Sequence, residues 1–147
     1  MLFRTATRAD LPALVAMLAD DPLGQGRESA DLAPYLAAFD RIAAQPMHQI
    51  IVAETGGRVV ATCQLTILDG LSRQGMTRAL VEAVRTVPDL RGQGIGAALM
   101  AEAEARARAA GARMVQLTTD KSRLRAHAFY DRLGYAPSHL GYKKMLD

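Results

Sequence analysis

The sequence has little cysteine and no tryptophan; its one cysteine is Cys63. A single cysteine forms no internal disulfide, so we expect a reducing, cytoplasmic setting. No apolar run approaches the ~18 residues of a membrane-spanning helix, and residues 1–11 lack the apolar segment of a signal peptide, so no membrane partner is expected. The three separated histidines and one cysteine show no metal-ligand spacing, and no metal site is predicted.

The 147 residues are half hydrophobic and 22% charged, which predicts a single globular domain over 1–147. The net charge of +3 is unevenly distributed, because 1–90 sum to −2 and 91–147 to +5. A basic C-terminal third is consistent with an anionic ligand and equally with a solvated basic face. No Lys/Arg-rich run interleaves with aromatics, so no nucleic-acid partner is expected.

Hydrophobic periodicity and turn residues predict an α/β layered domain with a mixed sheet, in the order β-α-α-β-β-β-α-β-α-β. Thr7 and Asp10 have the spacing of a helix N-cap and its acidic N3 residue. The predicted strands are 2–5, 49–54, 58–68, 78–87, 114–118 and 140–146. The predicted helices are 11–18, one starting near 31, 94–110 and 122–133.

The first chemical feature is a turn with three glycines in five residues, Gly92, Gly94 and Gly96, between a strand and a long helix. A helix start leaves backbone N–H groups unpaired and carries about half a positive charge. Glycines let such a backbone close around a phosphate or pyrophosphate. The spacing matches neither a P-loop nor the Rossmann fingerprint, and an ordinary tight turn is the alternative interpretation.

Two motifs resemble the GNAT (GCN5-related) N-acetyltransferase superfamily. The turn Arg91-Gly92-Gln93-Gly94-Ile95-Gly96 is similar to the family signature R/Q-x-x-G-x-G/A. The segment from Ala126 to Tyr135 is similar to the later A-x-x-F-Y-x-x-L-G-F/Y motif. The resemblance implies a mostly antiparallel central sheet flanked by helices, acetyl-CoA as cosubstrate, and transfer of the acetyl group to a primary amine of a small molecule or peptide by direct attack.

The resemblance also implies the cofactor site. The pyrophosphate would bind the turn, and the pantetheine arm would pair with the strand before it. Relatives often carry an asparagine seven residues before the catalytic tyrosine, and here that position is Arg123, which is expected to contact a phosphate instead. The cofactor-binding residues implied in this way are Val84, Arg85, Thr86, Arg91, Gly92, Gln93, Gly94, Ile95, Gly96, Ala97 and Arg123.

Two catalytic residues are proposed from the resemblance. Tyr130 falls on the family tyrosine that protonates the leaving thiolate; the alternative is a core tyrosine. Glu82 is the candidate base, since strand alternation would place it on the face of Leu80, Val84 and Thr86. A structural carboxylate paired with Arg78 or another arginine is the competing explanation for Glu82.

The sequence does not identify the acceptor.

Cys63 is interpreted as a small buried hydrophobic residue, because no base lies near it in the sequence. An acyl-CoA-binding sensor without catalytic activity is the alternative function. A homodimer is expected only because it is the commonest soluble assembly.

Overall fold

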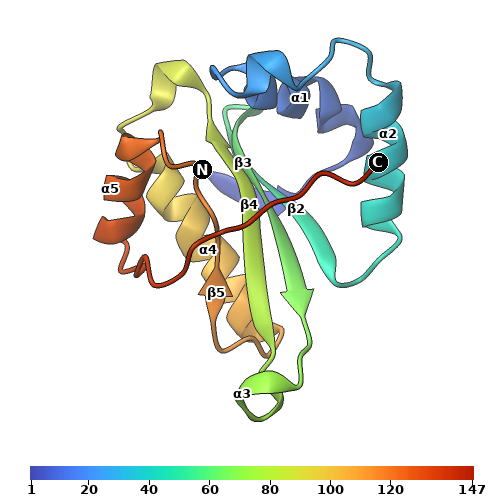
Figure 1. Ribbon diagram of the computed structural model, residues 1–147. Coiled ribbons are helices and arrows are strands. Elements are labelled where there is room, and N and C mark those ends of the chain that lie inside the picture. The colour runs from blue at the N-terminus through green and yellow to red at the C-terminus, as the bar shows by residue number, and fades with distance from the viewer. The chain divides into compact units, whose positions relative to one another are not determined.

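The computed structural model describes residues 1–147 in two compact units, 1–116 and 117–147. The first unit contains a five-stranded sheet and most of the helices (Figure 1). Its strands are β1 (Leu2–Thr5), β2 (His48–Thr55), β3 (Arg58–Leu68), β4 (Arg78–Thr86) and β5 (Val115–Gln116). Its helices are α1 (Leu11–Ala19), α2 (Ala33–Ala43), the single turn α3 (Ser72–Gly75) and α4 (Ile95–Ala109), with short 3-10 helices η1 (Arg8–Asp10), η2 (Gly24–Gly26) and η3 (Pro88–Leu90).

The strands lie in the order β1-β2-β3-β4-β5, so each strand pairs with its neighbour in the sequence. The first four are antiparallel, and β4 and β5 are parallel. Gly56 and Gly57, both with positive φ, form the turn between β2 and β3. The expected mixed, mostly antiparallel sheet flanked by helices is confirmed.

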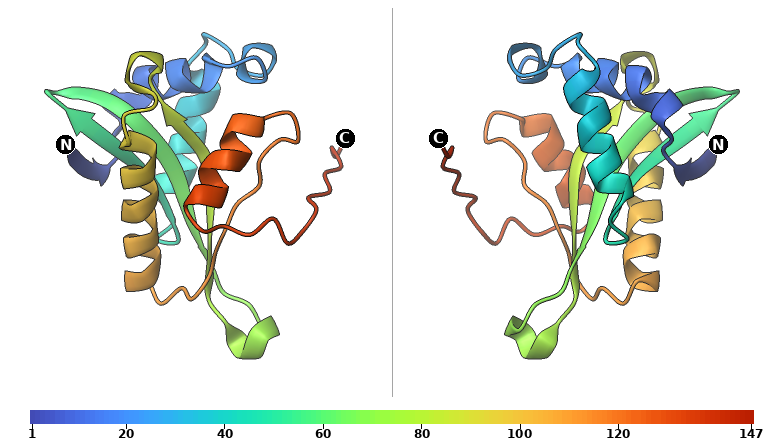
Figure 2. Two further views of the ribbon diagram at one scale, coloured as in Figure 1. Left: turned by 90° about the vertical axis from the view of Figure 1, so that its left-hand side faces the viewer. Right: turned by 90° about the vertical axis from the view of Figure 1, so that its right-hand side faces the viewer.

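Helices cover both faces of the sheet in the first unit (Figure 2). Thr5, Ile51 and Cys63 lie in one row across the sheet and face α4, whose Arg106 donates to Thr5 Oγ1 at 3.3 Å. The alternate row runs from Arg4 through Val52 and Thr62 to Arg85, on the face of α1 and α2. Because both faces are covered, the middle of β2 is fully buried.

Small side chains let α4 pack closely against the sheet. The residues of α4 that are buried are Leu99, Met100, Ala103 and Ala107. Leu99, Ala103 and Ala107 recur every four residues along one face of the helix, and Ile95, four residues before Leu99, is half-buried. No helix of the chain is long and apolar enough to cross a bilayer.

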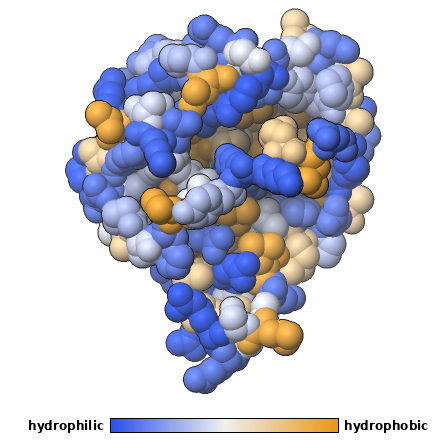
Figure 3. All heavy atoms as spheres, in the orientation of Figure 1, coloured by the Kyte–Doolittle hydropathy of each residue, from blue (hydrophilic) through white to orange (hydrophobic).

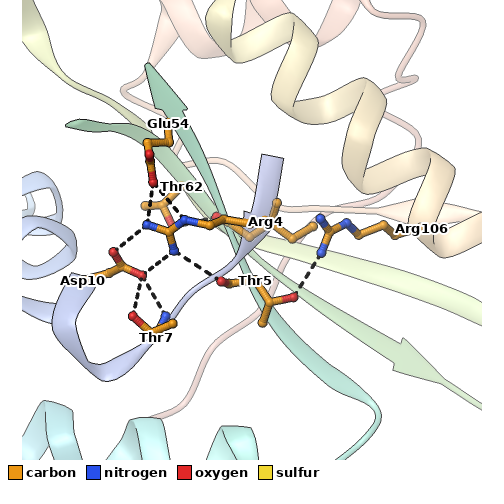
Figure 4. Close-up of polar contacts among 8 residues, drawn as sticks. Arg4, Thr5, Thr7, Asp10, Glu54, Thr62 and Arg106 are labelled. Atoms are coloured by element: carbon orange, nitrogen blue, oxygen red, sulfur yellow. Dashed lines mark hydrogen bonds and ion pairs between the residues drawn. The ribbon is translucent and has the colours of Figure 1, made fainter. Parts of the chain in front are cut away.

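A charged cluster fixes the start of the chain on the sheet (Figure 4). The Arg4 guanidinium donates to both carboxylate oxygens of Asp10, at 2.8 and 2.9 Å, and to Glu54 of β2 at 2.9 Å. Asp10 also accepts the Thr7 N–H at 2.7 Å, which forms the predicted capping box. The hydrogen bond from Arg4 lowers the pKa of Asp10 to about 2.

The second unit contains α5 (Leu124–Arg132), which ends close to where the sequence predicted. The strand predicted over 140–146 is wrong, because residues 136–147 have no regular secondary structure. A segment forms a strand only if its backbone finds a ladder partner, and no strand pairing includes residues 140–146. The expectation of one domain over 1–147 stays a prediction.

Candidate active site

A β-bulge interrupts β4 at the centre of the sheet. Gln64 pairs with Glu82 and Thr62 pairs with Arg85, so the single residue Cys63 lies opposite two residues of β4. One of these two is Ala83, whose φ of 52° is left-handed. A non-glycine residue in that region is strained, and bulges are frequent beside active sites, where they redirect side chains.

The bulge changes which residues share a face with Glu82. Strict alternation predicted that Glu82 would lie with Val84 and Thr86; beyond Ala83 this is wrong, because the extra residue shifts the alternation by one. Glu82 shares its face with Leu80 and Arg85. Its side chain is exposed, not enclosed by apolar neighbours.

The last part of β4 has one edge that no strand of the first unit covers. β5 pairs only with Ala79 and Leu80. The Val87 N–H donates to Val60 O of β3, so by alternation Val84 and Thr86 direct their backbone groups to the opposite edge. Two arginine side chains donate hydrogen bonds to carbonyl oxygens on this edge. Arg85 Nη1 donates to Val84 O at 2.9 Å, and Arg91 Nε donates to Thr86 O at 3.1 Å.

Two consecutive aspartates after α1 hold these arginines. Asp21 pairs with Arg85 at 3.2 Å, and both side chains are largely buried. Asp20 pairs with Arg91 at 2.9 Å, with both side chains about half exposed. Asp21 also accepts the Gly24 N–H at 2.6 Å. The sequence did not reveal these contacts with β4, because nothing local indicates a partner 64 or 71 residues away.

The glycine turn begins at Gly92, six residues after the end of β4 and just beyond η3. Gly92 and Gly94 have φ values of 77° and 84°, a conformation that L side chains rarely adopt. Gly94 is the N-cap of α4, no side chain caps this helix, and Ala98 is the first residue to bond back to it. The N–H groups of the first three helical residues therefore have no helical acceptor. A Cβ at Gly92 or Gly94 would meet no atom within 4 Å, so no side chain or backbone blocks the space in front of these two glycines, and helix N-termini with free N–H groups are common phosphate sites.

The base of this turn is firmly held. Asp89 of η3 accepts two hydrogen bonds from Arg58 of β3, at 2.8 and 3.0 Å. This contact lowers the pKa of Asp89. Gln93 donates its side-chain amide to Asp89 O at 3.3 Å. The continuous segment 84–97 therefore contains all of the sequence-predicted cofactor residues except Arg123.

Tyr130 and Arg123 belong to the second unit. Arg123 is the N-cap of α5, and Tyr130 lies in the last turns of this helix. The Tyr130 ring makes edge contacts with the rings of Phe129 and Tyr135, at centroid distances of 5.0 and 5.8 Å. Before the helix, Asp120 accepts hydrogen bonds from the Ser122 hydroxyl and N–H, which lower its pKa.

Other nucleophilic and metal-binding candidates have ordinary structural environments. Cys63 is buried, and burial raises the pKa of its thiol to about 12, so it is a poor nucleophile. His48 Nδ1 lies 3.0 Å from Thr66 Oγ1. No group of three His, Cys, Asp or Glu residues could hold a metal ion.

Comparison with known proteins establishes the family. Residues 12–135 match the model of the Acetyltransferase (GNAT) family, so the chain belongs to this family. The resemblance found in the turn and in the Tyr130 segment is confirmed at the level of the family.

Three individual proteins are similar to the chain. The aminoalkylphosphonate N-acetyltransferase of Salmonella typhimurium is 39% identical over 95 residues, which are 65% of this chain and 61% of that protein. A solved structure described as a transcriptional regulator from Bacillus halodurans is 42% identical, with a TM-score of 0.95 over 99% of both chains. A putative acetyltransferase from Agrobacterium tumefaciens is 29% identical, with a TM-score of 0.89 over 99% of this chain and 100% of the other.

Proposed function

We propose that this enzyme transfers the acetyl group of acetyl-CoA to the primary amine of a small molecule. The observation that carries the proposal is the open glycine turn directly after a bulged strand, in a chain of the GNAT family. Bound acetyl-CoA would supply the activated thioester. The N–H groups from Gly92 to Ala97 would bind its pyrophosphate, and the edge at Val84, Arg85 and Thr86 would bind its pantetheine arm.

The chain would contribute three chemical functions. Backbone N–H groups near the end of β4 would donate to the acetyl oxygen as negative charge develops on it. Glu82 is exposed beside the bulge and would take the proton of the attacking amine, directly or through water. Tyr130 would donate its phenolic proton to the departing sulfur, and Arg123 would contact a phosphate.

A small-molecule acceptor is favoured by the relative that acts on aminoalkylphosphonates. A peptide amine is the other acceptor class considered. The cytoplasmic location stays a prediction. The homodimer also stays a prediction, and light scattering on the purified protein tests it.

A non-catalytic acyl-CoA sensor is the second candidate, favoured by the description of the similar Bacillus halodurans protein as a transcriptional regulator. One experiment separates the two functions: titration with acetyl-CoA in a calorimeter, followed by thiol release with a panel of amines, amino acids and peptides. The proposal expects binding and amine-dependent thiol release. Binding without release on any acceptor would favour the sensor, and no binding would refute both.

A further inference from the structure

Two opposite charges lie on one face of β4, four residues apart. Arg78 pairs in register with Leu68, Leu80 with Thr66, and Glu82 with Gln64. All three β4 residues precede the bulge, so the ordinary alternation puts them on the same face. At about 3.3 Å per residue, Arg78 and Glu82 are roughly 13 Å apart along the strand.

Neither charge has a partner of opposite sign. Arg78 and Glu82 take part in none of the ion pairs of the sheet and its helices. The interpretation that Glu82 pairs with Arg78 is therefore wrong. Asp69, in the loop between β3 and β4, accepts a hydrogen bond from the Thr77 hydroxyl at 3.0 Å instead of an ion pair from Arg78.

The β3–β4 loop leaves space for the Arg78 side chain. A Cβ at Gly70 would lie 3.2 Å from Arg78 Nη1, tighter than most such contacts. Gly70 does not have a positive φ, so its backbone conformation does not require glycine. The missing side chain instead makes room for a half-buried guanidinium. At the tip of the loop, Leu71 is 97% exposed, and this end of the hairpin, at the bottom of Figure 3, mixes hydrophilic and hydrophobic surface.

We propose that Arg78 determines acceptor specificity by binding an anionic group of the acceptor, while Glu82 faces its amine. The substrate class is then a short amino-alkyl acid, with a phosphonate or a carboxylate at the other end. This inference rests on the proposed function. The cofactor edge at Val84–Thr86, the bulge, Glu82 and Arg78 follow one another along β4, so an acceptor that reaches the bulge amine-first extends toward Arg78.

Arginine suits this role. Its planar guanidinium offers parallel N–H donors that match a phosphonate or carboxylate in a bidentate geometry. Arg78 Nη1 lies beside Gly70, so the flexible guanidinium would turn along the strand toward Glu82 for a short zwitterion to pair with both charges. A neutral amine would leave Arg78 without a partner.

The test compares aminoethylphosphonate, β-alanine and propylamine as acceptors of wild-type enzyme and Arg78→Met. We expect wild type to prefer an acidic acceptor. Arg78→Met should raise KM for the preferred acid about 10- to 100-fold, the effect of losing a hydrogen bond between charged groups, and leave KM for propylamine unchanged. Calorimetric binding of the same acid to the enzyme saturated with CoA should weaken in parallel. Arg78→Lys should restore part of the loss.

Arg108→Met is the matched control, because Arg108 is exposed on α4, across the sheet from Arg78, and loses the same charge. An equal rise in KM for the acid and for propylamine would overturn the role of Arg78, and so would a wild-type enzyme that does not prefer the acids. In both cases the enzyme would still acetylate amines, so the proposed function would stand. A wild type that acetylates none of the three amines would also overturn it; its affinity for acetyl-CoA then tests the cofactor site separately. Thermal melts of Arg78→Met and Arg78→Lys identify any loss caused by unfolding.

Discussion

Arg85 of β4 and Asp21, which follows α1, form an ion pair with Nε and Oδ2 3.2 Å apart, and their side chains are only 13% and 14% exposed. This pair joins the segment after α1 to the open edge of the bulged strand. The same aspartate accepts the Gly24 N–H, so one carboxylate organises both the strand edge and the following turn.

Asp21→Asn should therefore destabilise the fold by about 3 kcal/mol, since it leaves a largely buried guanidinium without its counter-charge. The neighbouring Asp20→Asn is a matched control: its pair with Arg91 is about half exposed and should contribute at most about 1 kcal/mol. Urea unfolding measures both variants. If both variants lose a similarly small amount of unfolding free energy, the Asp21–Arg85 pair does not anchor this segment.

Ala83→Gly should stabilise the protein by about 1 kcal/mol, because glycine adopts the left-handed conformation of the bulge without the strain of a Cβ. Ala79→Gly, in the regular part of the same strand, should have the opposite sign, since there glycine only adds freedom to the unfolded chain and removes a buried methyl group. Chemical denaturation compares the pair. Destabilisation by both substitutions would argue against a strained bulge.

The Arg4–Asp10 pair makes stability depend on pH in the acid range. The pKa of Asp10 is lowered from 3.8 to about 2, chiefly by the hydrogen bond from Arg4. The stabilisation is thus complete above pH ~4 and is lost as the pH falls toward 2; two pKa units correspond to about 2 to 3 kcal/mol.

Asp10→Asn should lower the unfolding free energy at neutral pH and flatten its decline between about pH 4 and 2. Asp40→Asn serves as the control, because its pair with Arg8 is more than half exposed. If the unfolding free energy of Asp10→Asn falls between about pH 4 and 2 as steeply as that of the wild type, this assignment is contradicted.

Tyr130→Phe should reduce kcat by about 10²- to 10⁴-fold, the usual contribution of a general acid, while acetyl-CoA affinity stays nearly constant. The substitution keeps the aromatic ring and so keeps its edge contacts with Phe129 and Tyr135. Tyr135→Phe removes a hydroxyl from the same ring cluster and should leave kcat close to wild type. Full activity of Tyr130→Phe would exclude the acid role.

The parts of the fold that depend on local chemistry could be predicted from the sequence. Gly56-Gly57 forms the β2–β3 turn, and Gly92 and Gly94 form a second turn, where both have the positive φ that glycine adopts most readily. The capping box at Thr7 and the buried face of α4 follow from short-range periodicity. Each of these features is encoded within a few consecutive residues.

The features that the sequence did not reveal all depend on distant partners. The bulge at Ala83 exists because β3 and β4 pair in a shifted register, and alanine is not a residue that indicates positive φ. The ion pairs of Asp20 and Asp21 join residues 71 and 64 positions apart. Residues 140–146 were predicted to form a strand, but a strand also needs a partner in the ladder.

The central claim is that the amides of the glycine turn bind the pyrophosphate of acetyl-CoA, and calorimetric titration of Gly94→Asp tests it most directly. The new carboxylate would project into open space in front of the turn and repel the diphosphate. Gly111→Asp, with a φ of 88° after the other end of α4, carries the same substitution and backbone cost away from the turn. The account predicts that acetyl-CoA binds wild type and Gly111→Asp alike but does not bind Gly94→Asp. Wild-type affinity in Gly94→Asp would contradict it.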